Sequence, residues 1–193
     1  MSDETAEPLE DDEEPDAEAQ ARRRLALAQV RQWGDPALRL RAAEVETFGP
    51  DLGRLAERMA DLMRDARGVG LAATQVGVLR RLFVIQAEPD AEATAVVNPV
   101  LETRDGELES ASEGCLSLQG VNVPVERSTS VVLTGRDLRG ETLRLELEGV
   151  PARVAQHELD HLDGVLIIDR TTPEARREAL GILRPTPLLG AAR

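Results

Sequence analysis

The sequence contains no lysine, a single cysteine, and no apolar run long enough to cross a lipid bilayer. A membrane-spanning helix needs about 18 or more consecutive apolar residues, so we expect neither a transmembrane segment nor a membrane partner. One cysteine cannot form an internal disulfide, which favours a reducing, cytoplasmic environment. The N-terminus has no basic segment followed by an apolar stretch, so we expect no secretory signal.

Negative charge is concentrated near the N-terminus. The formal net charge is −13, but ten of the 36 acidic residues lie between residues 3 and 18, where no basic residue occurs. Such a segment has too few apolar groups to offset its ordering entropy, so we predict a disordered acidic tail over residues 1–20. The rest of the chain has 26 acidic and 23 basic residues, so its charges nearly balance. One folded domain is expected over 21–193. A DNA-binding protein would show a basic excess, and this sequence has none.

The hydrophobic pattern predicts a helix, then several strands, then further helices. Apolar residues at spacings of three and four predict an amphipathic helix over residues 51–66. Strands are expected over 81–87, 95–101, 130–134, 142–148 and 165–168, and the other helices over 21–28, 151–162 and 174–183. Asn98-Pro99 predicts an edge or a break in the strand that contains it. This order predicts an α+β fold, a single compact domain of antiparallel or mixed sheets around a central helix.

Two histidines, the only ones in the sequence, stand four residues apart in His157-Glu158-Leu159-Asp160-His161. Residues four apart share one face of a helix, so both imidazoles can reach one metal ion. Glu158 lies beside the first histidine, where its carboxylate can accept a proton from a metal-activated water. The central helix is therefore the predicted metal-binding helix, and the alternative is a surface helix with two incidental histidines. Asp160 and Asp163 are either solvated residues or partners of the imidazole N–H groups.

A catalytic metal site needs a third protein ligand and an open position. Cys115, within Glu113-Gly114-Cys115-Leu116-Ser117, is one candidate, because a thiolate and two imidazoles would leave one position for water. Taken alone, a single cysteine is more often a small buried hydrophobic residue. The glycine before it favours the ligand interpretation, since it permits close approach of the backbone. The downstream candidates are all carboxylates, namely Asp163, Asp169, Glu174 and Glu178.

A third segment, Gly68-Val69-Gly70-Leu71-Ala72-Ala73-Thr74-Gln75, has little side-chain bulk. A ligand can therefore lie against its backbone. A phosphate-binding loop is the rival interpretation, but the Gly-x-Gly-x-x-Gly pattern is incomplete and no Lys-Ser/Thr follows. Gln75 could instead offer its amide N–H to a developing oxyanion.

Taken together, the segments Gly68 to Gln75, Glu113 to Ser117 and Gln156 to His161 resemble the motifs of the peptide deformylases, in the order found in that family. The resemblance spans roughly residues 25–184. It implies a metal-dependent hydrolase that removes the N-formyl group from the formyl-methionine of nascent polypeptides. It also implies a cytoplasmic enzyme that meets nascent chains at the ribosome, and we expect a monomer.

The same resemblance implies a role for each site residue. Cys115, His157 and His161 would hold one divalent metal ion, Fe(II) by expectation, with zinc, nickel or cobalt also able to occupy the site. Glu158 would be the general base and acid, while Gln75 and the Leu116 backbone N–H would stabilise the oxyanion. Gly70 would bind the substrate backbone. The pocket for the methionine side chain would be lined, in addition to His157, by Val69, Glu113, Val150, Arg153 and Val154.

The sequence also departs from the family pattern. Arg153 stands where an aliphatic residue is usual, and we expect its stem to pack in the pocket with the guanidinium turned outward. Gln119 occupies the position of a proline, and Asn122 stands where arginine is common. Two alternatives are therefore considered. An ordinary zinc peptidase could use the same His-Glu-x-x-His helix, and Gln119, Asn122 and the acidic tail leave open a non-catalytic peptide- or ribosome-binding module.

Overall fold

The computed structural model describes residues 17–86, 88, 91–104 and 106–183. Within them, the helices are α1 (Ala17–Leu27), α2 (Pro50–Asp65), α3 (Gly149–Leu162) and α4 (Pro173–Leu183). The strands are β1 (Gly70–Ala72), β2 (Leu82–Ile85), β3 (Thr94–Thr103), β4 (Leu108–Gly114), β5 (Asn122–Ser128), β6 (Ser130–Arg136) and β7 (Thr142–Glu148). The chain is therefore an α+β domain, as predicted.

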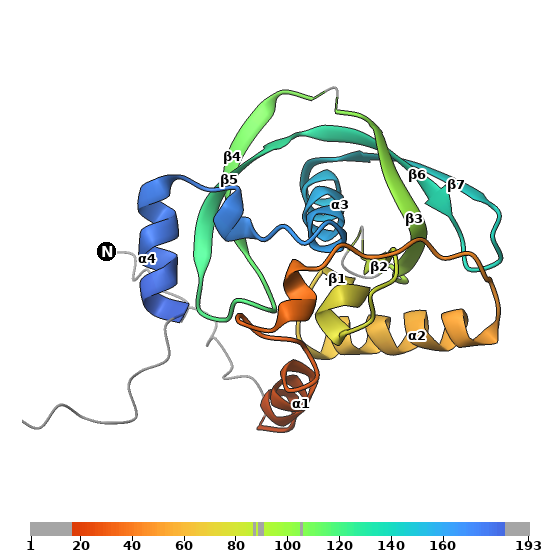
Figure 1. Cartoon of the computed structure of the whole chain (residues 1–193), viewed down its shortest axis with the longest axis horizontal. Coiled ribbons are helices and arrows are strands. Elements are labelled where there is room, and N and C mark those ends of the chain that lie inside the picture. The colour runs from red at the N-terminus through yellow and green to blue at the C-terminus, as the bar shows by residue number, and fades with distance from the viewer. Residues whose placement is uncertain (1–16, 87, 89–90, 105, 184–193) are drawn as a thin grey trace, which may run out of the picture.

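The strands form two antiparallel sheets, one of five strands in the order β1-β2-β3-β6-β7 and a hairpin of β4 and β5. Figure 1 shows α3 enclosed between these sheets at the centre of the fold. No helix in the described ranges is long and apolar enough to cross a membrane.

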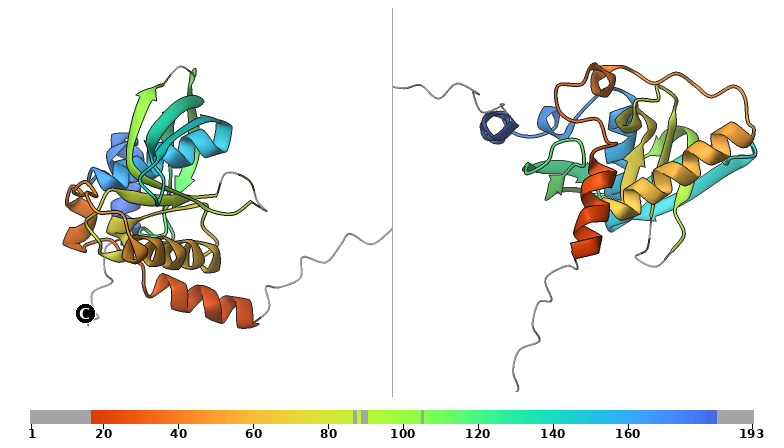
Figure 2. Two further views of the ribbon diagram at one scale, coloured as in Figure 1. Left: turned by 90° about the vertical axis from the view of Figure 1, so that its right-hand side faces the viewer. Right: turned by 90° about the horizontal axis from the view of Figure 1, so that it is seen from below.

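The side chains of β2 point alternately to the two faces of the five-stranded sheet, and helices pack against both faces at this strand. Leu82 and Val84 belong to a core cluster with α1 and α2, whereas Phe83 and Ile85 belong to a cluster with α3. Successive side chains of a strand point to opposite faces, so a fully apolar strand is the expected solution here. Figure 2 shows α2 on the face of β1 and β2 that lies away from α3, with α1 outside it.

The predicted break at Asn98-Pro99 is a bulge inside a continuous strand rather than an edge. β3 lies between β2 and β6, and its register with β6 shifts between Val97 and Val100. Asn98 has a φ of 50°, a conformation that asparagine tolerates better than most residues. Its side chain accepts a hydrogen bond from the Val45 N–H at 2.8 Å and donates one to the Val45 carbonyl at 2.9 Å. Pro99, which has no N–H to pair, therefore sits where the ladder is interrupted.

Two expectations about local structure were wrong. Residues 165–168 do not form a strand, because a 3₁₀-helix occupies Ile167–Asp169 and its apolar side chains pack against β5 and α4. Residues 17–20, assigned to the acidic tail, form the first turn of α1, while the rest of that predicted tail, residues 1–16, lies outside the described residues. The three-residue strand β1 and the seven-residue strands β4 and β5 are not among the predicted strands.

Replacing Asn98 with alanine should lower the free energy of unfolding by about 2–3 kcal/mol, since two backbone contacts are lost and alanine is strained at positive φ. Asn98→Gly should cost less than the alanine variant, because glycine accepts this conformation. Urea denaturation measures both values. Glu102→Ala, an exposed change on the same strand, is the control, and an equal effect of all three would contradict this account.

Candidate metal centre and active site

The two histidines of α3 and Cys115 of the β4–β5 hairpin converge in the structure. The Cys115 sulfur lies 3.2 Å from His161 Nε2, and one ligand atom of each of the three residues lies within 4.8 Å of the others. Both imidazoles lie on one face of α3, with ring centroids 5.0 Å apart, as their spacing of four predicts. Cys115 follows directly after β4, so the hairpin carries its sulfur to the helix.

The chemistry of these three groups fits a divalent cation. His157 Nδ1 lies 3.1 Å from the Glu113 carboxylate, which leaves the other ring nitrogen of His157 for a metal ion. Although burial opposes its charged form, hydrogen bonds with Cys115 and Glu113 raise the pKa of His157 well above its ordinary value. The Cys115 and Glu113 side chains thus favour a positive charge at this point. Two imidazoles and a thiolate form a donor set typical of zinc and iron sites.

Glu158 lies beside the ligands and is almost completely buried. Burial raises its pKa to about 7, so its carboxyl group can both accept and release a proton near neutral pH. Among the described residues, no group bonds to its Oε2 atom. A Cβ at Gly70 would lie 2.4 Å from Glu158 Oε1, so only glycine at position 70 leaves room for the carboxylate. Burial also lowers the pKa of His161 well below its ordinary value, which keeps that imidazole neutral and able to bind a metal.

Gln75 is oriented toward Cys115 by its own backbone surroundings. Its Oε1 atom accepts a hydrogen bond from the Ala72 N–H at 2.8 Å. Its Nε2 atom therefore points to the opposite side, toward Ser117 Oγ at 3.1 Å and the Cys115 sulfur at 3.7 Å. The next backbone amide after Cys115, that of Leu116, has no acceptor within the described part of the chain. The Leu116 N–H is thus free to donate to a ligand, while Gln75 Nε2 already contacts Ser117 and Cys115.

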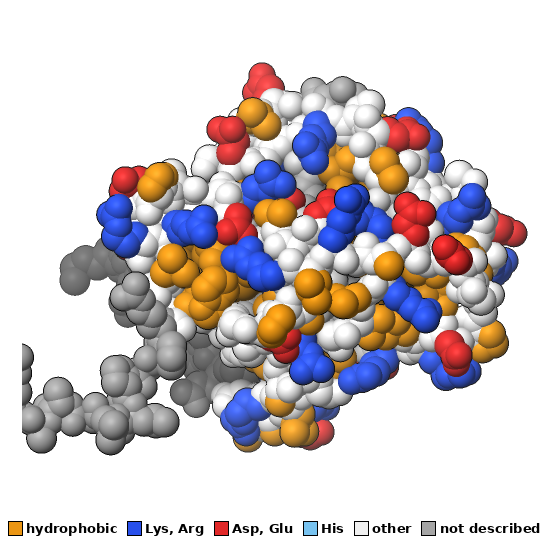
Figure 3. Space-filling view, in the orientation of Figure 1, with side chains coloured by type: hydrophobic (Ala, Val, Ile, Leu, Met, Phe, Trp, Pro, Cys, Tyr) orange, Lys and Arg blue, Asp and Glu red, His pale blue; other side chains and the backbone are white. Residues whose placement is uncertain are grey.

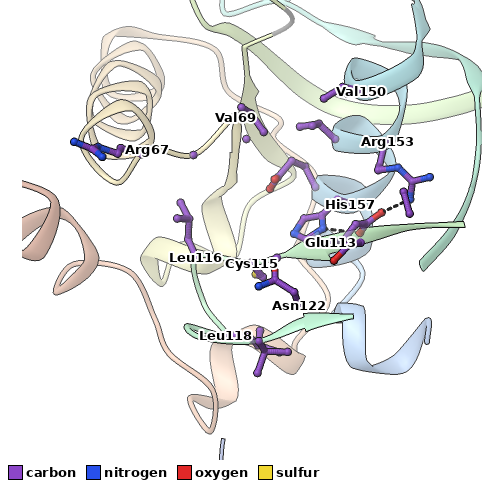
Figure 4. Close-up of a pocket in the computed structure, with 18 of the residues that line it drawn as sticks. Arg67, Val69, Glu113, Cys115, Leu116, Leu118, Asn122, Val150, Arg153 and His157 are labelled. Carbon is purple, nitrogen blue, oxygen red and sulfur yellow. Dashed lines mark hydrogen bonds and ion pairs between the residues drawn. The ribbon is translucent and has the colours of Figure 1, made fainter. Parts of the chain in front are cut away.

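A cavity of about 710 Å³ opens above these groups. Figure 4 shows Glu113, Cys115 and His157 in its wall, with Val69 and Val150 on the side of β1 and α3. Both valines are more than half exposed, which is consistent with the rim of a binding pocket. Of the twelve residues predicted for the site, eleven line this cavity: Val69, Gly70, Gln75, Glu113, Cys115, Leu116, Val150, Arg153, Val154, His157 and Glu158. The twelfth, His161, lies buried beneath it.

The guanidinium of Arg153 does not turn outward as expected. It donates to Glu113 Oε1 and to the Val125 carbonyl, each at 2.8 Å, and to the Glu109 carbonyl at 2.7 Å. The side chain therefore joins α3 to both strands of the β4–β5 hairpin, and Figure 4 shows Arg153 beside Glu113. A planar group with five donors suits this bridge better than an aliphatic side chain could.

Arg127 is the main site residue that the sequence reasoning missed. Its guanidinium is buried and donates two hydrogen bonds to Glu113, each at 3.0 Å, and one to Asp160 at 2.6 Å. Hydrogen bonds with His157 and Arg127 outweigh the desolvation of the carboxylate and lower the pKa of Glu113 to about 2. Asp160 also binds Arg170, and hence it partners arginines rather than an imidazole. The burial of Arg127 is indicated by the alternating pattern of β5, because Arg127 lies on the same inward face as Val123 and Val125.

Asp163 is the more exposed of the two aspartates whose roles were left open. It forms a 2.7 Å ion pair with Arg81 outside the metal-ligand cluster. Neither Asp163 nor the other downstream carboxylates belongs to that cluster.

Comparisons with known proteins agree with one another. The family model described as Polypeptide deformylase matches residues 27–177. A peptide deformylase of Thermotoga neapolitana is 49% identical over 150 residues, which cover 78% of this chain and 90% of that protein. Peptide deformylase 1 of Corynebacterium glutamicum is 43% identical over 162 residues, covering 83% of this chain and 96% of that protein.

Solved structures show the same similarity. A peptide deformylase from Synechococcus elongatus in complex with actinonin has a TM-score of 0.75 and 37% identity, covering 81% of this chain and 91% of that one. The enzyme from Thermotoga maritima has a TM-score of 0.71 and 47% identity, covering 75% of this chain and 97% of that one.

Replacing Arg127 with leucine should lower the free energy of unfolding by about 3–5 kcal/mol, because two carboxylates would lose their buried counter-charge. Arg127→Lys keeps the charge without the planar fork and should have an intermediate effect. Urea denaturation provides the measurement, with Arg144→Leu as the matched surface control. Equal unfolding midpoints for Arg127→Leu and Arg144→Leu would contradict the role assigned to this network.

Proposed function

Because this chain belongs to the peptide deformylase family, it is a metal-dependent hydrolase that removes the N-formyl group from nascent polypeptides, and we propose that the cavity above α3 is its active site. One observation carries the proposal most directly: three metal-ligand groups and a buried carboxyl group with a pKa of about 7 meet at one end of a cavity. Cys115, His157 and His161 hold the metal ion, and Fe(II) is the proposed occupant. The ligand set also accommodates zinc, nickel or cobalt.

When bound, a divalent cation supplies Lewis acidity toward a carbonyl oxygen and an adjacent water. Glu158 takes the proton of the attacking water and gives it to the departing amine, since its raised pKa suits both steps. Gln75 Nε2 and the Leu116 N–H donate hydrogen bonds to the formyl oxygen as it gains negative charge. Loss of one such donor typically costs about 3–4 kcal/mol of transition-state stabilisation.

The substrate is proposed to lie along β1. This strand is at an edge of the five-stranded sheet, so the backbone of Gly70 can pair with an extended peptide. Val69, Val150 and Val154 offer apolar surface to the methionine side chain, together with Glu113, His157 and the aliphatic stem of Arg153. The hydrogen bonds among Glu113, Arg127 and Arg153 hold the Glu113 and Arg153 side chains in place in the pocket wall.

We also propose that the enzyme acts in the cytoplasm as a monomer on chains emerging from the ribosome. Its arginines are interspersed with carboxylates on the face shown in Figure 3, which favours brief contact over tight binding to nucleic acid. The acidic segment at residues 3–18 lies before the region that matches the family, so removing it should leave catalysis intact.

The zinc peptidase alternative makes a different prediction about substrates. A deformylase hydrolyses a formyl-methionyl peptide at the formamide bond and leaves the peptide bonds intact. Protein purified under anaerobic conditions should release formate from that peptide and should not cleave its unformylated counterpart. Peptide-bond cleavage of both substrates would instead support the peptidase, and hydrolysis of neither would support the binding module.

Changing Glu158 to glutamine or alanine should reduce deformylation by a factor of about 100 or more while the metal remains bound, because proton transfer is lost but the ligands are untouched. Formate release and metal content measure the two effects separately. Glu148→Gln, an exposed change at the start of the same helix, serves as the control. Near wild-type turnover of the Glu158 variants would remove this residue from the mechanism.

Changing Cys115 to serine should deplete the purified protein of its metal, since a neutral hydroxyl is a much poorer ligand than a thiolate. Elemental analysis after anaerobic purification checks this and also identifies the metal of the wild-type protein. Ser117→Ala, two residues further along the same turn, should keep its metal. A Cys115→Ser variant with full metal occupancy would show that the third ligand lies elsewhere.

A further inference from the structure

The loop that follows α1 contacts the backbones of both proposed oxyanion donors. The Arg31 N–H donates to the Gln75 carbonyl at 2.7 Å, and the Trp33 N–H donates to the Ser117 carbonyl at 2.9 Å. Between them, Gln32 Nε2 donates to the Leu116 carbonyl at 3.1 Å. Gln75 and Leu116 lie on different segments of the fold, and residues 31–33 join the backbones of these segments, in addition to the contacts of the Gln75 side chain with Cys115 and Ser117.

The amide of Gln32 is held in a single orientation by three hydrogen bonds. Its nitrogen donates to the carbonyls of Val30 at 3.0 Å and Leu116, and its oxygen accepts from Gln119 Nε2 at 3.0 Å. Rotation of this amide by 180° would place its oxygen against two carbonyls and its nitrogen against another donor. The network therefore fixes both the orientation of Gln32 and its contact with Leu116.

The supported segment consists of two consecutive tight turns. The Leu118 N–H donates to the Cys115 carbonyl at 3.0 Å, and the Val121 N–H donates to the Leu118 carbonyl at 3.2 Å. Gly120 has a φ of 77°, so it fits the third position of the second turn, and Gln119 fits the second position, where proline is favoured. In this chain Gln119 contributes a side-chain bond to Gln32 where a proline would have restricted the backbone. Figure 4 shows Leu116 and Leu118 in this connection, to the left of Cys115 and below it in the view.

We propose that Gln32 is a positioning residue for catalysis, which sets the Leu116 N–H relative to Gln75 and is itself oriented by Gln119. This inference rests on the proposed function, because it assumes that Leu116 and Gln75 are the oxyanion donors. Hydrogen bonds of this kind stabilise a transition state only at distances of about 2.7–3.1 Å from the developing charge. A shift of the turn by a fraction of an ångström would therefore slow the reaction without changing the pocket for the methionine side chain.

The test uses Gln32→Glu, which keeps the size of the side chain but cannot donate to the Leu116 carbonyl. Gln32→Leu removes all three hydrogen bonds, and Gln119→Ala removes only the orienting one. Gln29→Glu, a change to a glutamine in the same loop that has no contact with the turns in the described residues, is the matched control. For each full-length protein loaded with metal, kcat and KM are measured with a formyl-methionyl peptide, and amide hydrogen exchange is followed at Leu118.

We expect kcat to fall about tenfold in both Gln32 variants and about threefold in Gln119→Ala, with KM, metal content and melting temperature unchanged. The Leu118 amide should exchange faster in the Gln32 variants and at the wild-type rate in the control. Unchanged kcat and exchange in Gln32→Glu would overturn the proposal. Loss of activity together with metal or melting temperature would also overturn it, since the residue would then be merely structural.

The outcome separates this proposal from the proposed function. If the wild-type protein releases no formate from a formyl-methionyl peptide, the proposed function is rejected independently of Gln32. The exchange rates of the Leu118 amide then decide alone whether Gln32 supports the turn. Wild-type exchange in both Gln32 variants would reject that support whatever the activity.

Discussion

The geometry of the metal centre depends on the buried ion pairs that join the β4–β5 hairpin to α3. Cys115 belongs to the hairpin connection and the two histidines belong to the helix, so the three proposed ligands converge only if these elements are fixed relative to one another. Arg127 supplies this link by binding Glu113 on the hairpin and Asp160 on the helix. Glu113 in turn contacts His157, which connects the same network to the orientation of a metal ligand.

Burial raises the pKa of both neighbouring carboxyl groups, but their different hydrogen-bond partners give them opposite net shifts. Glu113 forms hydrogen bonds with His157 and with the buried guanidinium of Arg127, and its pKa falls to about 2. Glu158 is also buried but lacks such a direct partner, and its pKa rises to about 7. One carboxylate therefore remains charged as a structural partner, while the other can exchange a proton at neutral pH. Such separation of pKa values between two acids is how protein sites commonly divide structural and catalytic work.

Features encoded by local spacing could be predicted from the sequence, whereas those formed by distant contacts could not. The spacing of His157 and His161 was sufficient to place both on one helix face, and the proposed partnership with Cys115 agrees with the observed cluster. Arg127 on β5 has its partners on two other elements, Glu113 on β4 and Asp160 on α3, so no local pattern identified them. The apolar run at 165–168 resembled a strand, but contacts with α4 and β5 favour a tighter helical turn.

X-ray absorption spectroscopy of the metal-loaded protein provides the most direct test of the central claim, which is that one sulfur and two imidazoles bind a single cation. For the zinc-loaded enzyme, the account predicts one sulfur neighbour at about 2.3 Å and two imidazole nitrogens at about 2.0–2.1 Å, with one further light atom. A zinc environment that contains only nitrogen and oxygen neighbours would contradict it, because Cys115 would then not be a ligand.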